Sequence, residues 1–193
     1  MIQGLLDKGF GSVDNWFSDS EIRSLRQSLV THYDQKHFHE ARIGKNENFQ
    51  KHKLIRTDQV HWLDKDIANA AETRFFDKMD GFVSYLNETC FTGLQNYEFH
   101  YAIYPSGSFY KKHVDRFKND NSRLFSFVAY LTEKWEDGDG GELVLYLKGE
   151  SVLVIPSPGK VVFFPSELEH EVLLSKSERM SLTGWLKVSS ILS

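Results

Sequence analysis

The chain has 193 residues, of which 40% are hydrophobic and 26% charged, as in globular proteins with a full core. Its net charge is −4, so no overall basic field indicates nucleic-acid binding. No stretch approaches the roughly 18 apolar residues of a membrane helix, and the first residues, with Asp7 and Lys8, lack a signal-peptide core. Cys90 is the only cysteine, which favours a reducing compartment. We expect one cytoplasmic domain, residues 1–193, with neither a membrane nor nucleic acid as its partner.

A helix is predicted over about residues 19–33. Ser18 and Glu21 have the spacing of a capping box, and Phe17 and Ile22 flank it as a hydrophobic staple. Helical spacing of the apolar side chains continues through Leu25, Leu29 and Tyr33. One face of this helix should therefore pack on the core.

Residues 34–53 are polar and predict a long loop, a candidate lid over a binding site. The loop contains His37, His39 and His52, which raises the question of a metal site. The pair His37 and His39 has no cysteine or carboxylate partner at a recognised zinc spacing, so a solvated loop is the preferred interpretation.

The next segments predict a strand and a second helix. Residues 54–63 have the composition of a strand and its exit, and residues 67–86 carry an apolar stripe at helical spacing that begins with Ile67. Gly81 weakens this helix locally.

From Leu94 the hydrophobic pattern changes to a period of two. Tyr97, Phe99, Tyr101 and Ile103 alternate with Glu98, His100, Ala102 and Tyr104. Further short apolar runs follow, separated by turns rich in glycine and proline, at 124–131, 143–147, 152–155, 161–164, 172–174 and 180–188. Such a series predicts an antiparallel sandwich or a jelly roll, buttressed by the helices of the first ninety or so residues.

His113 and Asp115 are the strongest candidates for chemistry. On an extended strand, residues two apart point to the same face, so an imidazole and a carboxylate would project side by side. They make two-thirds of the 2-His-1-carboxylate triad of non-haem Fe(II) oxygenases, and His170 is the candidate third ligand. His32 and Asp34 have the same spacing but end a predicted helix, where such residues do not share a face.

Arg179 opens the last strong strand, nine residues after His170. A buried guanidinium is costly unless it meets an anion, and its planar fork suits a carboxylate. A metal triad with such an arginine nearby fits an enzyme that holds a dicarboxylate cosubstrate.

Over roughly residues 54–187 the chain resembles the Fe(II)/2-oxoglutarate-dependent dioxygenases. Within them it is similar to the prolyl 4-hydroxylase group, most of all to hypoxia-sensor-type prolyl hydroxylases and their bacterial relatives. The matching positions occur in the family's order and are Ile55, Arg56, Asp58 and Trp62, Tyr104 and Pro105, His113, Val114 and Asp115, Tyr130, Leu131 and Trp135, Gly140, Gly141 and Leu143, Phe163 and Phe164, His170, Glu171 and Val172, and Arg179 and Trp185.

The resemblance implies a mostly β fold with buttressing helices, a double-stranded β-helix (jelly roll). Its helices, loop and leading strand would occupy about residues 1–92, and its catalytic core about residues 93–188. It also implies hydroxylation of a protein or peptide substrate, at a prolyl residue, with O2 and 2-oxoglutarate converted to succinate and CO2. Ascorbate would serve as reductant.

The resemblance also assigns roles to individual residues. It implies Fe(II) ligands at His113, Asp115 and His170, with no catalytic residue beyond them. Arg179 would pair with the distal carboxylate of 2-oxoglutarate and Tyr130 would hydrogen-bond to it. Tyr104 would line the pocket near the cosubstrate. Two alternatives stay open, a hydroxylase of a free amino acid or small metabolite, and a non-catalytic metal-binding jelly-roll module.

Two further expectations concern the surroundings of this site. His100 shares a face with Tyr104, and a hydrogen-bonded structural histidine is the preferred interpretation of it. A local basic cluster surrounds the triad in sequence, and we expect a solvated rim there, or a surface that attracts acidic substrates; its members are Lys111, Lys112, Arg116, Lys118 and Arg123.

Overall fold

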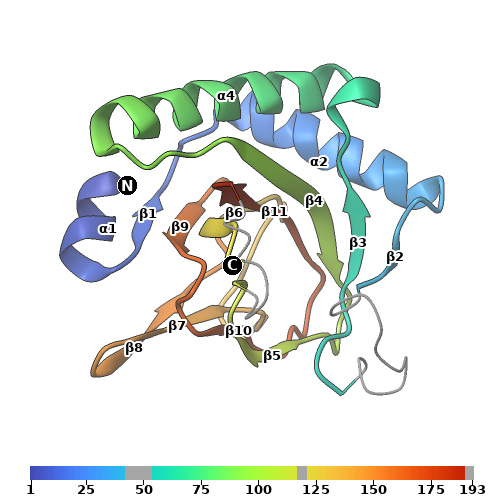
Figure 1. The fold of residues 1–193 in the computed structure, drawn as a ribbon. Coiled ribbons are helices and arrows are strands. Elements are labelled where there is room, and N and C mark those ends of the chain that lie inside the picture. Colours follow the sequence, from blue (N-terminus) through green and yellow to red (C-terminus); the bar gives the residue numbers. More distant parts are fainter. Residues whose placement is uncertain (42–53, 117–120, 190–193) are drawn as a thin grey trace.

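The computed structural model describes residues 1–41, 54–116 and 121–189, and in it two antiparallel β-sheets face each other beneath a layer of helices (Figure 1). The larger sheet has the strand order β1 (Gly11–Val13), β9 (Val161–Pro165), β6 (Arg123–Tyr130), β11 (Arg179–Lys187), β4 (Asn96–Tyr104), β3 (Gln59–Trp62) and β2 (His39–Glu40). The smaller sheet has the order β5 (Tyr110–His113), β10 (His170–Val172), β7 (Leu143–Leu147) and β8 (Glu150–Val154). The prediction of a mostly β jelly roll with helices is confirmed.

Helices α2 (Asp19–Asp34) and α4 (Ala70–Cys90) cover the outer face of the larger sheet (Figure 1). The predicted capping box of α2 is present, since the backbone amide of Ser18 donates to Glu21 at 2.7 Å and that of Glu21 donates to the Ser18 hydroxyl at 3.3 Å. The prediction for this helix is confirmed within one residue.

The second helix begins later than predicted. Asn69 caps α4 and Glu72 completes a second capping box, so Ile67 lies outside it, in the 3-10 turn η1 (Lys65–Ile67). Ile67 is 83% exposed and was wrongly placed on the buried stripe. The helix also continues to Cys90, an exposed free cysteine, beyond the predicted end at residue 86.

The predicted strand 54–63 is shorter in the structure. Only Gln59–Trp62 pairs with β4, while Arg56 makes an isolated bridge to Tyr110. Of the predicted loop 34–53, His39–Glu40 forms β2 against β3, and residues 42–53, including His52, lie outside the described residues.

Two elements near the N-terminus were not predicted. Helix α1 (Ile2–Lys8) ends at Gly9, whose φ of 79° is left-handed, and the Gly9 amide donates to the Leu5 carbonyl. The short strand β1 then pairs with β9 at the edge of the larger sheet. Among the described residues, no helix is long and apolar enough to cross a membrane.

The larger sheet separates two apolar clusters. In β4, Phe99, Tyr101 and Ile103 belong to the cluster beneath the helices, whereas Ala102 and Tyr104 belong to the cluster between the two sheets. This is the alternation that the period-two pattern predicts. Every strand of the sheet centre therefore presents one set of side chains to the helices and the other to the barrel interior.

Candidate active site

His113, Asp115 and His170 come together where β5 pairs with β10 in the smaller sheet. His113 ends β5 and His170 begins β10, and the two residues are paired across the strands. Nε2 of His113 lies 3.6 Å from Oδ1 of Asp115, and Nε2 of His170 lies 3.4 Å from Oδ2. The three side chains can each offer a ligand atom within 4.8 Å of the others. Neighbouring ligands of one ion would lie about 3 Å apart for bonds of about 2.1 Å, so small movements would complete a metal site.

Both imidazoles are held in the same tautomer. Nδ1 of His113 donates to the carbonyl of Lys111 at 2.8 Å, and Nδ1 of His170 donates to the carbonyl of Leu168 at 2.8 Å. A carbonyl only accepts, so each Nδ1 carries the proton and each Nε2 turns a lone pair toward Asp115. Orientation of a ligating histidine through its other nitrogen is usual at protein metal sites.

Asp115 is buried and ionised. Burial alone would raise the pKa of its carboxyl group, but His170, His113 and the hydroxyl of Ser126 together hold that pKa well below its usual range. Ser126 donates to Oδ2 at 2.7 Å and lies 3.0 Å from the hydroxyl of Ser166. The carboxylate therefore has a fixed direction and a charge available to a cation.

Arg179 is buried opposite Tyr104 in the pairing of β11 with β4. Its guanidinium carbon lies 4.7 Å from the Tyr104 ring centre and 4.9 Å from that of Tyr130. Its Nε and the Tyr130 hydroxyl, both buried, have no hydrogen-bond partner among the described residues. Arg179 is not a surface arginine, because its side chain is only 4% exposed and forms no ion pair within the described chain.

These unsatisfied donors fit a carboxylate that the protein does not itself supply. An unpaired buried guanidinium is costly, and a carboxylate can accept two parallel bonds from its fork. The same pocket is lined by the triad and Arg179, so one small dicarboxylate has a cation site at one end and a guanidinium at the other. The donor set therefore fits Fe(II) with 2-oxoglutarate.

Comparison with known proteins agrees with this geometry. The sequence profile of the 2OG-Fe(II) oxygenase superfamily matches residues 99–187, which include the triad and Arg179. A Pseudomonas putida prolyl-4-hydroxylase is 34% identical, with 98% of this chain and 97% of that chain covered and a TM-score of 0.87. The chain belongs to the 2OG-Fe(II) oxygenase superfamily.

Two more distant structures share the fold. A Trichoplax adhaerens prolyl hydroxylase, in complex with a hypoxia inducible factor oxygen degradation domain peptide fragment, is 24% identical, with 96% of this chain and 86% of that chain covered and a TM-score of 0.87. A Phytophthora capsici prolyl 4-hydroxylase is 24% identical, with 98% and 62% covered and a TM-score of 0.71. The protein is thus a dioxygenase of a family that uses Fe(II), 2-oxoglutarate and O2.

Two glycines of this oxygenase allow Arg179 to sit where it does. Gly140 and Gly141 have φ of 72° and 74°, in the left-handed region. A Cβ on Gly140 would lie 2.2 Å from the carbonyl oxygen of Leu174, and one on Gly141 would lie 3.0 Å from Cδ of Arg179. The paired glycines of the sequence motif therefore keep a close turn against Leu174 and Arg179.

Arg56 and Asp58 form a buried ion pair at the pocket wall. Nε and Nη2 of Arg56 donate to the two carboxylate oxygens at 2.8 and 2.6 Å. The guanidinium lies 4.1 Å from the ring centre of Tyr110, which in turn stacks on His113 with ring centres 3.5 Å apart. Tyr110 was not among the predicted site residues, although it stands three positions before His113 on the same strand. The contacts from Asp58 through Arg56 and Tyr110 therefore hold the ring of His113 from behind.

His100 lines the pocket and does not have the hydrogen-bonded structural role that was preferred for it. Its ring is buried between Trp62 and Trp185, at centre distances of 4.8 and 5.4 Å. Its Nδ1 has no hydrogen-bond partner among the described residues. Burial, with nearby Arg56, lowers the pKa of His100 to about 3, so the ring is neutral. His100 is thus a neutral polar side chain of the pocket lining, and its Nδ1 neither accepts nor donates a hydrogen bond within the described part of the chain.

The basic cluster around the triad is largely neutralised by acidic neighbours. Lys112 pairs with Glu169 at 2.7 Å, Arg116 with Glu167 at 3.1 Å, and Arg123 with Glu98 at 2.7 Å. Lys118 lies outside the described residues. The solvated-rim interpretation fits these pairs better than a surface that attracts acidic substrates.

Proposed function

We propose that this oxygenase hydroxylates a prolyl residue of a protein or peptide substrate. The observation that carries the proposal is its 34% identity, over 98% of the chain, with the Pseudomonas putida prolyl-4-hydroxylase. The Trichoplax adhaerens enzyme of the same fold holds a peptide fragment, which supports a peptide as the substrate here.

We assign Fe(II) to His113, Asp115 and His170. Three protein ligands on one side of an ion leave positions open for cosubstrate and O2, as the 2-His-1-carboxylate class requires. The fixed tautomers and the ionised carboxylate support this assignment.

We assign the distal carboxylate of 2-oxoglutarate to Arg179 and Tyr130. The buried guanidinium and the unsatisfied Tyr130 hydroxyl support this assignment, with Tyr104 forming the wall beside them. The cosubstrate would replace the hydrogen bonds that these donors lack in the protein alone. Its length would then place its other end against the triad.

Bound Fe(II), 2-oxoglutarate and O2 together supply an oxidant that places one oxygen atom of O2 in a C–H bond, while the other enters succinate and CO2 is released. The chain holds and shields these reactants. Val128, Leu143, Phe164 and Val172 line the pocket and restrict water, which preserves the strength of the charge interactions inside it. Asp115 stays ionised throughout, and Nδ1 of each histidine keeps its proton on a backbone carbonyl.

Two finer expectations belong with this proposal. Ascorbate would keep the iron reduced when 2-oxoglutarate is consumed without substrate, which the resemblance to prolyl 4-hydroxylases supports. A reducing, cytoplasmic location is supported by the single free cysteine, Cys90.

The test is succinate formation in the presence of Fe(II), ascorbate and 2-oxoglutarate, with proline-containing peptides or free L-proline added. We expect peptides to stimulate succinate release and to gain one oxygen atom on proline, as read by mass spectrometry. Stimulation by free amino acids alone would favour the small-metabolite hydroxylase. Complete failure to consume 2-oxoglutarate, with or without substrate, would favour the non-catalytic module.

A further inference from the structure

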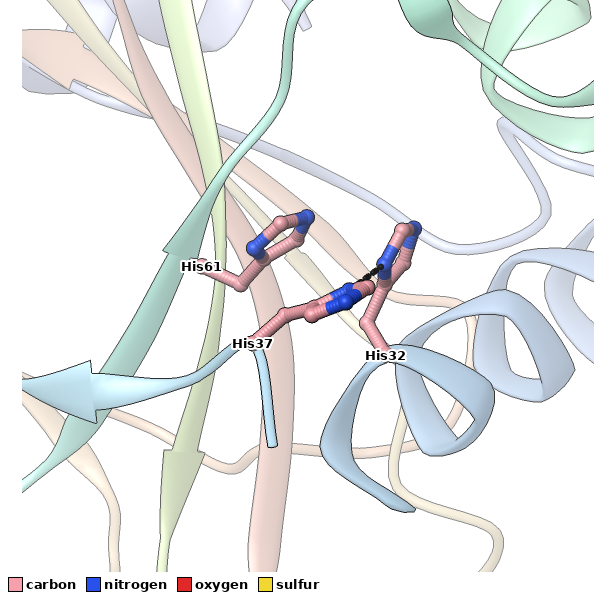
Figure 2. Close-up of side chains that lie close together, drawn as sticks. All are labelled: His32, His37 and His61. Carbon is pink, nitrogen blue, oxygen red and sulfur yellow. Dashed lines mark hydrogen bonds between the residues drawn. The ribbon is translucent and has the colours of Figure 1, made fainter. Parts of the chain in front are cut away.

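Three histidines from separate segments meet beside β3, on the helix-covered side of the larger sheet. Figure 2 shows how their side chains lie. His32 lies in the last turn of α2, His37 between α2 and β2, and His61 in β3. Their rings offer nitrogen atoms that all lie within 4.8 Å of one another. Nδ1 of His32 and Nδ1 of His37 are 3.0 Å apart, and the rings of His32 and His61 stack with centres 4.1 Å apart.

This histidine cluster is distinct from the iron site. His61 is paired with Tyr101 across β3 and β4, and directly opposite residues share a face of the sheet. Tyr101 belongs to the apolar cluster beneath the helices, and its ring centre lies 6.2 Å from that of His32. The triad occupies the barrel interior, so the larger sheet separates the two groups of histidines.

A buried carboxylate orients His32. Nε2 of His32 lies 2.9 Å from Oε1 of Glu72, a residue that is 3% exposed. The same carboxylate accepts from the Ser28 hydroxyl at 2.6 Å and from the backbone amide of Asn69 at 3.0 Å, so it cannot turn away. A proton on Nε2 that is donated to Glu72 leaves the Nδ1 lone pair facing His37. Carboxylate–histidine pairs of this kind orient ligands at metal sites.

The rings of the cluster disfavour one another's charge. Burial, followed by the neighbouring ring of His32, lowers the pKa of His61, while a hydrogen bond with the backbone of His37 acts in the opposite direction. A neutral imidazole keeps a lone pair for a metal, whereas a protonated one has none.

We propose that His32, His37 and His61 bind a divalent transition metal of the zinc type through one nitrogen each, with water completing the coordination. Three imidazoles without a carboxylate ligand suit Zn²⁺ and its neighbours in the first transition row. A metal lies in the plane of each ring that binds it, so His61 must tilt from its stacked position on His32. The ion would join the end of α2 to β3 and stabilise that junction.

The alternative is that the cluster is only packing. His37 can donate a proton to His32 and satisfy both nitrogens without an ion. The two possibilities differ in stoichiometry, and the chain offers a matched control. His39 is exposed and two residues from His37 but lies outside the cluster, so His37→Ala and His39→Ala remove similar side chains from the same segment.

The experiment is equilibrium dialysis of the chelator-stripped full chain against Zn²⁺. We expect two equivalents in the wild type and in His39→Ala, and one equivalent in both His37→Ala and His170→Ala, since the last variant removes the iron site instead. The proposal would be overturned if His37→Ala still bound two equivalents of Zn²⁺. It would also be overturned if the wild type bound only one equivalent and His170→Ala bound none. Circular dichroism of each variant shows whether it is folded.

A second variant tests the orienting carboxylate. Glu72→Gln keeps the shape of the side chain but removes its charge, and loss of such a partner typically lowers metal affinity about 10–100-fold. We expect this decrease in Zn²⁺ affinity at the histidine cluster only. Measuring it in the His170→Ala background, where the triad is broken, isolates that cluster. We also expect Zn²⁺ to raise the melting temperature in that background and to leave the His37→Ala, His170→Ala double variant unchanged. An equal rise in the double variant would contradict a site at the cluster.

Discussion

The two faces of the larger sheet differ in how completely their side chains are satisfied. On the helix face, Phe99, Phe127 and Phe163 are fully buried and pack on the rings of α4 and of Trp16. On the barrel face, polar atoms of the same strands are buried without partners in the described chain, at His100, Tyr130, Arg179 and Trp185. Among the described strands of this sheet, the helix face has one such atom, the Tyr101 hydroxyl, so the unpartnered polar atoms gather on the barrel face, where His100, Arg179 and Trp185 line the pocket of the triad.

Within a single strand, the side chains that stabilise the core and those that line the pocket lie on opposite faces. In β11, Met180, Leu182 and Leu186 face the helices, while Arg179, Ser181, Thr183 and Trp185 alternate with them on the barrel side. Apolar burial on one side offsets the free energy of holding unpaired donors on the other. Under the proposed assignment, these donors are already in position before the cosubstrate binds.

The largest expected effect comes from breaking the triad on the barrel face. His170→Ala should abolish Fe(II) binding at the triad and lower 2-oxoglutarate turnover by more than about 1,000-fold, or about 4 kcal/mol, because only two ligands remain there. Metal content and succinate formation measure it. His39→Ala, an exposed histidine outside both clusters, should leave both at the wild-type level. Retention of stoichiometric Fe(II) by the His37→Ala, His170→Ala double variant, in which both clusters are broken, would remove His170 from the site.

The next largest effect comes from the helix face. Phe127→Ala should lower the free energy of unfolding by about 3–5 kcal/mol, since Phe127 is fully buried and contacts Trp16 and Phe99 edge-on. Denaturant titration measures it. Where the variant is folded, its affinities for Fe(II) and 2-oxoglutarate should match the wild type. A parallel loss of metal affinity in the folded state would show that the two faces are not separable.

A smaller effect is expected at the hydroxyl that orients Asp115. Ser126→Ala removes the 2.7 Å hydrogen bond to Oδ2 and should weaken Fe(II) binding about 10–100-fold, as loss of orienting partners does elsewhere. Ser28→Ala is the matched control, because Ser28 donates to a buried carboxylate on the helix face. We expect Fe(II) affinity to be unchanged in that variant. Equal weakening in both would mean a general loss of structure.

The smallest expected effect comes from removing the Tyr130 hydroxyl, which should lower the affinity for 2-oxoglutarate but not the free energy of unfolding. Tyr130→Phe should lower the affinity for 2-oxoglutarate about fivefold, because one net hydrogen bond contributes about 1 kcal/mol. The ligand-free variant should be at least as stable as the ligand-free wild type, because it lacks a buried hydroxyl that has no hydrogen-bond partner among the described residues. Binding titrations and denaturant unfolding measure the two. A destabilised variant with unchanged 2-oxoglutarate affinity would give Tyr130 a structural role.

The sequence predicts features that depend on neighbouring residues along the chain. The alternation of Phe99 and Tyr101 with His100 and Ala102 is local, and so is the capping box at Ser18 and Glu21. The start of α4 was misplaced because the cap at Asn69 competes with an apolar Ile67 that fits the stripe equally well. Helix α1 is only seven residues long and was missed.

Long-range pairings are harder to predict from sequence. His113 and Asp115 have a recognisable spacing, but the approach of His170 depends on its pairing with β5, which the resemblance to a family suggested and local pattern did not. Nothing in the spacing of His32, His37 and His61 predicts that they meet, since the packing of α2 on the sheet brings them together. Likewise, the missing hydrogen-bond partner of His100 Nδ1, which holds for the residues that the structure describes, depends on every neighbour in the pocket.

The most direct test of the account is anaerobic titration of the Fe(II)-loaded protein with 2-oxoglutarate, read by the visible charge-transfer band of the chelate. We predict that the band forms in the wild type. Arg179→Ala should lower the affinity for 2-oxoglutarate about 100-fold, because two charge-assisted hydrogen bonds to its distal carboxylate are lost. The affinity for Fe(II) should stay unchanged, because these bonds lie far from the metal. Arg179→Lys keeps the charge but loses the planar fork, so its affinity for 2-oxoglutarate should lie between those of the wild type and Arg179→Ala. Absence of the band in an Fe(II)-loaded wild type, or equal loss of Fe(II) and 2-oxoglutarate binding in Arg179→Ala, would contradict the account.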